Sequence, residues 1–338
     1  MTVSVIIPTH NYARFLAEAI DSLRGGTYSD WECVVVDDGS TDDTPALVAA
    51  LAASDPRIAY LSQAASGPSA ARNAGLARAS GEFVQFLDAD DLLGPRKLQH
   101  QLEIFGRHPD ADIVYGGVRY FVEDGADDGR AKAVRRWVAG SMPRVVSGSG
   151  ETVLAALVDD NIMVVEAPLI RRTLLSTVGG FDPRVRRMED WELWLRCAVE
   201  GAYFVHDGTD DEDAMPHVRV HSSSSSQDQI SMHEAAALVR TGIESKLPTP
   251  ALRRLNRRRV HEHWAIIGML EGVNGRLGLG MRRLLRAGFA ERRVKWLAWG
   301  VLMPVTRLPI GNRAMSRVRS SLAHRRGEEL RDWQTHWP

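Results

Sequence analysis

Short apolar runs alternate with helical patterns through the first 120 residues of the chain. Four runs have the length of buried strands, at residues 3–7, 32–36, 58–61 and 83–87. Between the first two, apolar residues recur at the spacing of one helix face: Tyr12, Phe15, Leu16, Ala19, Ile20 and Leu23. A helix near 95–105 and a strand at 113–115 continue the alternation. Strands that alternate with helices predict an α/β fold around a doubly wound, mainly parallel sheet.

Start and stop signals place the helices more closely. Asn11 is the expected N-cap of the first helix, and Gly25-Gly26 its stop. Thr44 is the expected cap of the second helix, with Pro45 at its first position. Residues 67–79 are rich in Ala and predict a third helix. Residues 122–150 are polar and rich in Gly, which predicts an irregular excursion that serves as a lid, an acceptor loop or a solvated surface loop.

Polar side chains gather where three of the predicted strands end. The segments are Pro8-Thr9-His10-Asn11, Asp37-Asp38 and Asp88-Ala89-Asp90-Asp91. Doubly wound sheets bind their ligands at the carboxyl ends of the strands. Clustered carboxylates repel one another unless a cation lies among them, and Asp oxygens suit Mg²⁺ or Mn²⁺. The three strand ends together predict a pocket for a metal and a phosphate-bearing ligand, whereas residues 88–91 alone would also suit a solvated acidic turn.

Two common nucleotide motifs are absent from the sequence. No Gly-x-Gly-x-x-Gly follows the first strand, and no Gly-Lys-Ser/Thr phosphate loop occurs. Asp37 and Asp38 would instead accept hydrogen bonds from a ribose or a base. Arg72 would pair with an acidic strand end or a phosphate, and taken alone it equally suits a surface helix residue with a salt bridge.

A second acidic segment follows the turn at Gly179-Gly180-Phe181-Asp182. Glu189 and Asp190 begin a helical pattern rich in Trp and Leu. A helix N-terminus favours anions, so capping explains one acid there. A carboxylate held at this place would also serve as a general base toward a bound hydroxyl.

Length and composition predict the number of domains and the cellular compartment. With 338 residues, 44% of them hydrophobic and 25% charged, the chain is expected to fold into one large and one smaller domain. Cys33 and Cys197 have neither metal spacing nor a disulfide pattern, which fits a reducing cytoplasm. No secretory signal is seen at the N-terminus, and no segment reaches the roughly 18 apolar residues of a membrane span.

The charge is distributed unevenly between the two ends of the chain. Residues 251–338 hold 19 Lys and Arg against 6 Asp and Glu, whereas residues 1–250 hold 23 against 37. We therefore predict an acidic catalytic domain at 1–228 and a basic helical module at 229–338, with helices near 232–245 and 251–270.

The basic module has a predicted partner. Arg and Lys beside the apolar segment 296–304 suit the face of an anionic membrane, which would place the protein at the inner face of the membrane. The alternative is a helical bundle that packs its Trp and Leu on the catalytic domain. No nucleic acid is expected, because no binding motif accompanies the charge.

The chain resembles the family-2 glycosyltransferases, which use a GT-A fold. The matching segments are VIIPTHN at 5–11, YSDWE at 28–32, VDDGSTD at 36–42, ARNAG at 71–75, FLDADD at 86–91, GGFD at 179–182, EDWELWLR at 189–196 and RVHS at 219–222. They follow the family's order, and together they are highly specific. Ser222–Ser226 would form a flap over the donor or a linker.

For the nucleotide, the resemblance implies a base-binding role for Asp38. Pro8 and Thr9 would line its pocket, and Asn11 belongs to the same set of cofactor-binding residues. Arg72 would lie near the nucleotide or the acidic strand end.

For the metal and the acceptor, the resemblance implies a second group of residues. Asp90 and Asp91 match the acidic motif that meets ribose, metal and diphosphate, with Asp88 in support. Asp90 and His221 are the expected ligands of Mg²⁺ or Mn²⁺, and His217 competes with His221. Asp190 would be the general base and Glu189 its neighbour.

The implied reaction is an inverting, metal-dependent transfer from a nucleotide-diphosphate sugar to an acceptor hydroxyl. The acceptor would be a glycan, a lipid-linked molecule or a small molecule, in polysaccharide, glycolipid or other glycoconjugate biosynthesis. Two alternatives are an inactive nucleotide-sugar-binding scaffold and a nucleotidyltransferase. The second is disfavoured because Pro8-Thr9-His10-Asn11 is not the Gly-rich basic loop that such an enzyme needs.

Overall fold

The computed structural model describes residues 1–124, 134–138, 145–221 and 228–302. The chain divides into two compact units, Met1–Ser222 and Ser223–Pro338. The expected boundary between residues 228 and 229 differs from this division by six positions. Each unit is described by itself below.

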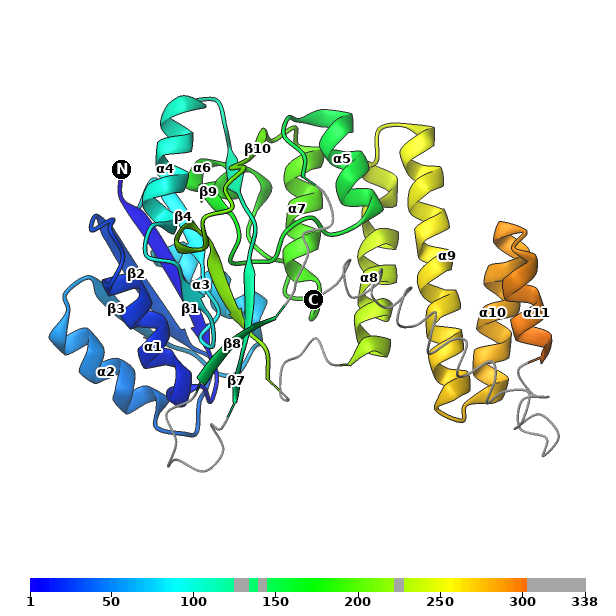
Figure 1. Cartoon of the computed structure of the whole chain (residues 1–338), viewed down its shortest axis with the longest axis horizontal. Helices are drawn as coiled ribbons and strands as arrows, with labels where there is room; N and C mark the ends of the chain where they lie inside the picture. Colours follow the sequence, from blue (N-terminus) through cyan, green and yellow to red (C-terminus); the bar gives the residue numbers. More distant parts are fainter. Residues whose placement is uncertain (125–133, 139–144, 222–227, 303–338) are drawn as a thin grey trace. The chain divides into compact units, whose positions relative to one another are not determined.

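The first unit is built on a seven-stranded sheet (Figure 1). Its strands lie in the order β10-β6-β9-β4-β1-β2-β3. Their bounds are β1 Val3–Thr9, β2 Trp31–Asp37, β3 Ile58–Ser62, β4 Phe83–Phe86, β6 Ile113–Tyr115, β9 Leu169–Arg171 and β10 Phe204–His206. β9 runs antiparallel to β4 and β6, and the other pairs are parallel. The predicted doubly wound, mainly parallel sheet is therefore confirmed.

Helices cover both faces of this sheet. Their bounds are α1 Ala13–Arg24, α2 Thr44–Ser54, α3 Pro68–Arg78, α4 Lys97–Arg107, α5 Gly150–Asp159, α6 Arg172–Val178 and α7 Glu189–Val199. Val3, Val5 and Ile7 of β1 share a buried cluster with side chains of α1, α2 and α4. α3 lies on the opposite face, where Gly75 approaches Ile6 so closely that no side chain would fit between them. Successive side chains of β1 therefore point to opposite faces of the sheet and pack against different helices.

Two expected helix caps are wrong. Asn11 has a φ of 59°, and Tyr12 holds the N-cap position of α1. The Asn11 side chain instead accepts hydrogen bonds from the backbone N–H groups of Thr41 and Asp42, at 2.7 and 3.2 Å. Asn tolerates the left-handed region of backbone conformation, so Asn11 can hydrogen-bond to the loop after β2 in place of capping α1. Thr44 lies inside α2, whose N-cap is Asp43.

A second, four-stranded sheet has the order β5-β11-β7-β8. Its strands are β5 Leu92–Leu93, β11 Pro216–Arg219, β7 Arg119–Asp124 and β8 Val134–Val138, and a short 3₁₀ turn at Glu212–Ala214 precedes β11. The prediction that 122–150 is irregular is wrong at these strands, because β7 and β8 pair as an antiparallel ladder. The lid prediction for residues 125–133 and 139–144 lies outside the described residues, as does the flap prediction for 222–226.

The described part of the second unit, residues 228–302, is helical, as expected. It contains α8 Gln229–Ile243, a 3₁₀ turn at Glu244–Lys246, α9 Pro250–Val273, α10 Leu277–Glu291 and α11 Val294–Leu302. Asp228 caps α8, and Thr249 caps α9. Ala265, Leu284 and Ala287 form a small buried core. Within the described ranges, no helix is both long enough and apolar enough to cross a bilayer.

Candidate functional site

The end of β4 distributes three carboxylates in three directions. The backbone N–H of Asp91 donates to the Asp88 carbonyl at 3.1 Å, which closes a tight turn around Ala89 and Asp90. Asp88 meets Arg72, Asp90 meets His221, and Asp91 enters the protein interior. The apolar β4 is buried in the sheet, so its end delivers all three acids to one place.

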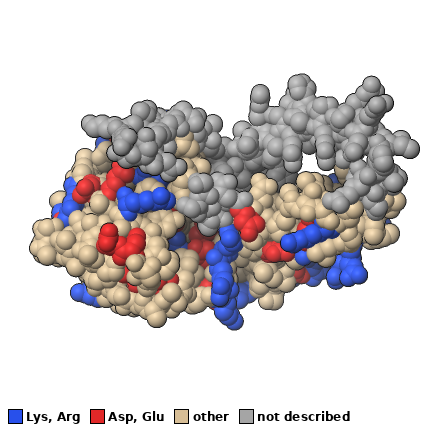
Figure 2. Space-filling view, turned by 90° about the horizontal axis from the view of Figure 1, so that it is seen from below, with Lys and Arg blue, Asp and Glu red and all other residues tan. Residues whose placement is uncertain are grey.

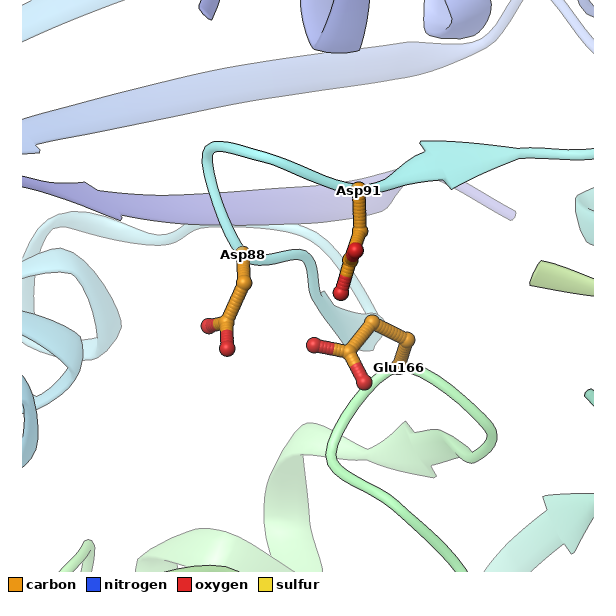
Figure 3. A group of neighbouring side chains, drawn as sticks. All are labelled: Asp88, Asp91 and Glu166. Carbon is orange, nitrogen blue, oxygen red and sulfur yellow. The ribbon is translucent and has the colours of Figure 1, made fainter. Parts of the chain in front are cut away.

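Asp88, Asp91 and Glu166 form a group whose oxygens lie within 4.8 Å of one another (Figure 3). Glu166 is 3% exposed, and its Oε1 is buried with no hydrogen-bond partner in the described parts of the chain. Burial first, and the neighbouring carboxylates second, raise the pKa of Asp91 and of Glu166 well above their usual values. Such a group is stable when its acids share protons or when a cation lies among them.

Sequence reasoning missed Glu166. The residue interrupts the apolar segment between Ile162 and Ile170, just before β9. Its backbone carbonyl accepts from the Gln85 side chain of β4 at 2.9 Å, which holds the segment against the acidic strand end. A single acid in an apolar run was the available signal, because a buried acid needs a partner.

Asp90 and His221 come together although 131 positions separate them. The His221 Nε2 lies 2.9 Å from Asp90 Oδ2, and the imidazole packs beside the rings of Phe15 and Tyr12. Two neighbouring ligands of one octahedral Mg²⁺, each about 2.1 Å from the ion, lie about 3 Å apart. The pair therefore fits a divalent cation. The competitor His217 instead lies 3.0 Å from the Glu212 carbonyl oxygen.

Arg219 supports the acidic turn from β11. Its backbone N–H donates to Asp91 Oδ1 at 2.7 Å, and its Nε donates to the Asp90 carbonyl at 2.8 Å. The guanidinium lies 4.7 Å from the ring centres of both Phe15 and Phe121. The sequence motif contained this residue, but only the fold shows what it holds.

Arg72 joins the acidic strand end to α7. It donates to Asp88 Oδ1 at 2.6 Å and to Glu189 Oε1 at 2.7 Å. The interpretation as a surface helix residue is wrong, since Arg72 is only 3% exposed. Burial lowers its pKa, but the two carboxylates outweigh this and raise the pKa above its usual value. Arg72 thereby ties the first residue of α7 to the acidic end of β4.

Asp190 lies at the first turn of α7. Its Oδ1 accepts from the backbone N–H of Trp191 at 2.7 Å, and its Oδ2 accepts from Asn161 Nδ2 at 3.3 Å. Burial first, and the charge of Glu189 second, raise the pKa of Asp190 to about 7. The indole of Trp191 donates to the Leu157 carbonyl at 2.9 Å and anchors this turn on α5. A carboxyl with this pKa can exchange a proton near neutral pH.

The end of β2 places Asp38 among backbone donors. Its carboxylate accepts from Gln63 Nε2 at 2.7 Å, from Ser66 N at 2.8 Å and from Gly67 N at 2.7 Å. A carboxylate offers about four acceptor sites, so one direction is left for a further donor such as a base N–H. The neighbouring Thr9, at the end of β1 after Pro8, has a buried hydroxyl without a hydrogen-bond partner among the described residues.

The structure therefore brings most of the predicted residues to one edge of the sheet. Asp88, Asp90, Asp91, Arg72, Glu189 and His221 are connected by the contacts above. Asp38, Thr9 and Asn11 lie at the neighbouring ends of β1 and β2, where the Asp38 N–H donates to the Thr9 carbonyl at 2.8 Å. The individual roles of these residues stay predictions.

Comparison with known proteins gives a consistent result. The model of glycosyl transferase family 2 matches residues 4–152. An uncharacterised glycosyltransferase of Nostoc sp. is 32% identical over 247 residues, which cover 72% of this chain and 73% of that protein. The putative glycosyltransferase EpsE of Bacillus subtilis is 31% identical over 210 residues, or 59% and 67% of the two chains.

Solved structures agree on the fold. S. aureus TarS 1-349 in complex with UDP-GlcNAc has a TM-score of 0.61 at 19% identity, with 85% of this chain and 80% of that chain covered. The mannosyltransferase PcManGT from Pyrobaculum calidifontis, in complex with GDP-Man and Mn²⁺, has a TM-score of 0.56 at 20% identity, with 89% and 84% covered. These likenesses show a GT-A fold. Together with the sequence relatives and the acidic edge of the sheet, they show that the chain belongs to the family-2 glycosyltransferases.

Proposed function

We propose that the protein transfers a sugar from a nucleotide-diphosphate sugar to an acceptor hydroxyl with inversion, using Asp190 as the general base. The observation that carries this proposal is the Asp190 carboxyl, held at the start of α7 with a pKa of about 7. The contact of Arg72 with both Glu189 and Asp88 ties that helix start to the acidic strand end. Base and donor site would thus be held in one rigid arrangement.

In the proposed step, the acceptor oxygen attacks the anomeric carbon from the face opposite the leaving group. The bond between that carbon and the diphosphate oxygen breaks, and the nucleotide diphosphate leaves with the electron pair. Asp190 accepts the proton of the acceptor hydroxyl. Asn161 orients the Asp190 carboxyl through Oδ2, and Arg72 keeps the Glu189 charge engaged elsewhere.

A divalent cation, Mg²⁺ or Mn²⁺, would neutralise charge on the leaving diphosphate when bound. Asp90 and His221 would hold it, since their 2.9 Å separation fits two ligands of one ion. Asp91 and Glu166 would then be a proton-sharing pair behind the site, consistent with the raised pKa of both carboxyls.

The donor proposal draws on the structural relatives. TarS is described in complex with UDP-GlcNAc and PcManGT with GDP-Man. We infer a nucleotide-diphosphate sugar for this chain, bound with its base at Asp38, and a role in polysaccharide, glycolipid or other glycoconjugate biosynthesis. A cytoplasmic place of action rests on the two isolated cysteines and stays a prediction. Family membership disfavours both the inactive scaffold and the nucleotidyltransferase.

Asp190→Asn tests the assignment of the base. The amide cannot take up the acceptor proton, so we expect transfer to fall by about 10²-fold or more. Nucleotide binding should be retained, because Asp190 touches the acceptor side only. Transfer is measured with a panel of nucleotide sugars, and binding is measured by a nucleotide-induced thermal shift with Mn²⁺. Wild-type transfer rates in this variant would refute the role of Asp190.

A further inference from the structure

The helical unit leaves apolar side chains exposed on both α10 and α11. Phe289 is 70% exposed, Val294 is 76% exposed and Val301 is 62% exposed. Val294, Ala298 and Val301 follow one another at intervals of four and three residues, so they form one stripe along α11. Leu279, Arg282, Arg286 and Phe289 form a corresponding exposed stripe along α10. We call these two stripes the α10–α11 face.

The two helices are packed together firmly enough to present this face as a unit. Gly288 of α10 lies so close to Leu297 of α11 that no side chain would fit between them. Trp296 and Trp299 pack against the core formed by Ala265, Leu284 and Ala287. The tryptophans, which the sequence suggested as membrane contacts, therefore have a structural role. The exposed apolar surface comes from Phe and Val instead.

Positive charge surrounds the α10–α11 face. Between residues 282 and 295 there are six basic side chains and a single acid, Glu291, which lies 2.6 Å from His261. Arg283 pairs with Glu271, and Arg293 lies 4.0 Å from Glu262. The other four, Arg282, Arg286, Arg292 and Lys295, form no ion pair within residues 228–302. In Figure 2, blue Lys and Arg side chains and red Asp and Glu side chains are both visible on the tan surface of the described residues.

We propose that the α10–α11 face binds the surface of an anionic lipid bilayer. Phe289, Val294 and Val301 would enter the boundary between headgroups and acyl chains, and Arg282, Arg286, Arg292 and Lys295 would pair with lipid phosphates. A second copy of the chain fits less well, because two such faces would bring eight unpaired cations together. The proposal does not depend on the sugar-transfer chemistry.

Vesicle flotation of the full chain tests the proposal without any substrate. We expect it to float with vesicles that contain phosphatidylglycerol and to stay behind with pure phosphatidylcholine. Salt should weaken the binding, because exposed charges are screened. Phe289→Ser with Val294→Ser, and separately Arg282→Gln with Arg286→Gln, should each lower the bound fraction several-fold.

Matched controls lie elsewhere on the same unit. Leu238→Ser removes an apolar side chain of α8 that is 67% exposed, and Arg254→Gln removes an exposed cation of α9. Both controls should float like the wild type, and unchanged circular dichroism melting would show that every variant folds. The proposal fails if the wild-type chain does not float at low salt, or if the controls lose binding as strongly as the variants. It also fails if Phe289→Ser with Val294→Ser abolishes a dimer in sedimentation but leaves flotation unchanged, since the face then joins two copies.

Discussion

At the scale of single residues, arginines contact most of the acidic residues of the site, whereas no arginine donates a described hydrogen bond to Asp190. Arg72 engages Asp88 and Glu189, and Arg219 supports the turn of Asp90 and Asp91. Among the residues that the structure describes, Asp190 accepts hydrogen bonds from the Asn161 amide and from the backbone N–H of Trp191, and neither donor is a cation. Burial first, and the charge of Glu189 second, raise the pKa of Asp190 above its usual value.

Asn161→Ala should shift the pH dependence of transfer. The Asn161 hydrogen bond favours the ionised form of Asp190 and lowers its pKa against the larger effect of burial. Its loss raises that pKa, so the acidic limb of kcat/KM should move to higher pH. Since one such bond is worth about 1 kcal/mol, the pKa should rise by about 0.7, so we expect an about threefold loss at pH 7, an about fivefold loss at lower pH and recovery at higher pH. A uniform loss at every pH would mean that Asn161 positions the acceptor and does not tune the base.

Asp90→Asn and Glu166→Gln distinguish two places where a cation would fit: Asp90 with His221, and the group of Asp88, Asp91 and Glu166. We expect Asp90→Asn to weaken Mn²⁺-dependent nucleotide binding by about tenfold or more, because a charged ligand is lost. Glu166→Gln should change it little if Glu166 shares a proton with Asp91. Calorimetric titration of nucleotide with and without Mn²⁺ measures both variants. The reverse pattern would place the ion among Asp88, Asp91 and Glu166.

At the scale of elements, the site depends on how closely α3 lies on β1. Gly75 permits this approach, and Arg72 stands one turn earlier on the same helix. β11 pairs with the two-residue β5 and with β7. Its last residue, Arg219, and the nearby His221 reach the acidic turn at the end of β4. Two sheets are therefore needed to complete one acidic edge.

Gly75→Ala should destabilise the first unit. A Cβ at this position overlaps Ile6 Cγ2, and overpacking of this kind costs about 1–3 kcal/mol. The displaced helix should also move Arg72 and reduce transfer. Gly106→Ala in α4 is the control: its Cβ meets nothing within 4 Å, and it should be neutral or stabilising by up to about 1 kcal/mol. Thermal unfolding measures both, and equal melting temperatures would show that α3 can shift without cost.

At the scale of the whole molecule, negative charge predominates in residues 1–250 and positive charge in residues 251–338. Many arginines of the helical unit pair within that unit, such as Arg257 with Glu244 and Arg258 with Glu262. Four basic residues that form no ion pair within residues 228–302, Arg282, Arg286, Arg292 and Lys295, lie on α10, on α11 and in the turn between them.

The sequence by itself determined the alternation of strands and helices, because hydrophobic periodicity is a local property of the chain. It also indicated that Asp38, Asp90 and Asp91 would lie at one edge of the sheet, since the carboxyl ends of parallel strands lie at one edge. Periodicity did not decide the role of Asn11, because the Asn side chain can either cap a helix or hydrogen-bond to a neighbouring loop.

Only the tertiary structure decided which charges meet. Arg72 and Glu189 are 117 positions apart, and Asp90 and His221 are 131 positions apart. Glu166 stands alone in an apolar run, and its neighbours come from another strand. Such pairs depend on how helices and sheets pack, which no local pattern encodes. The burial that raises the pKa of Asp190 to about 7 arises from the same packing.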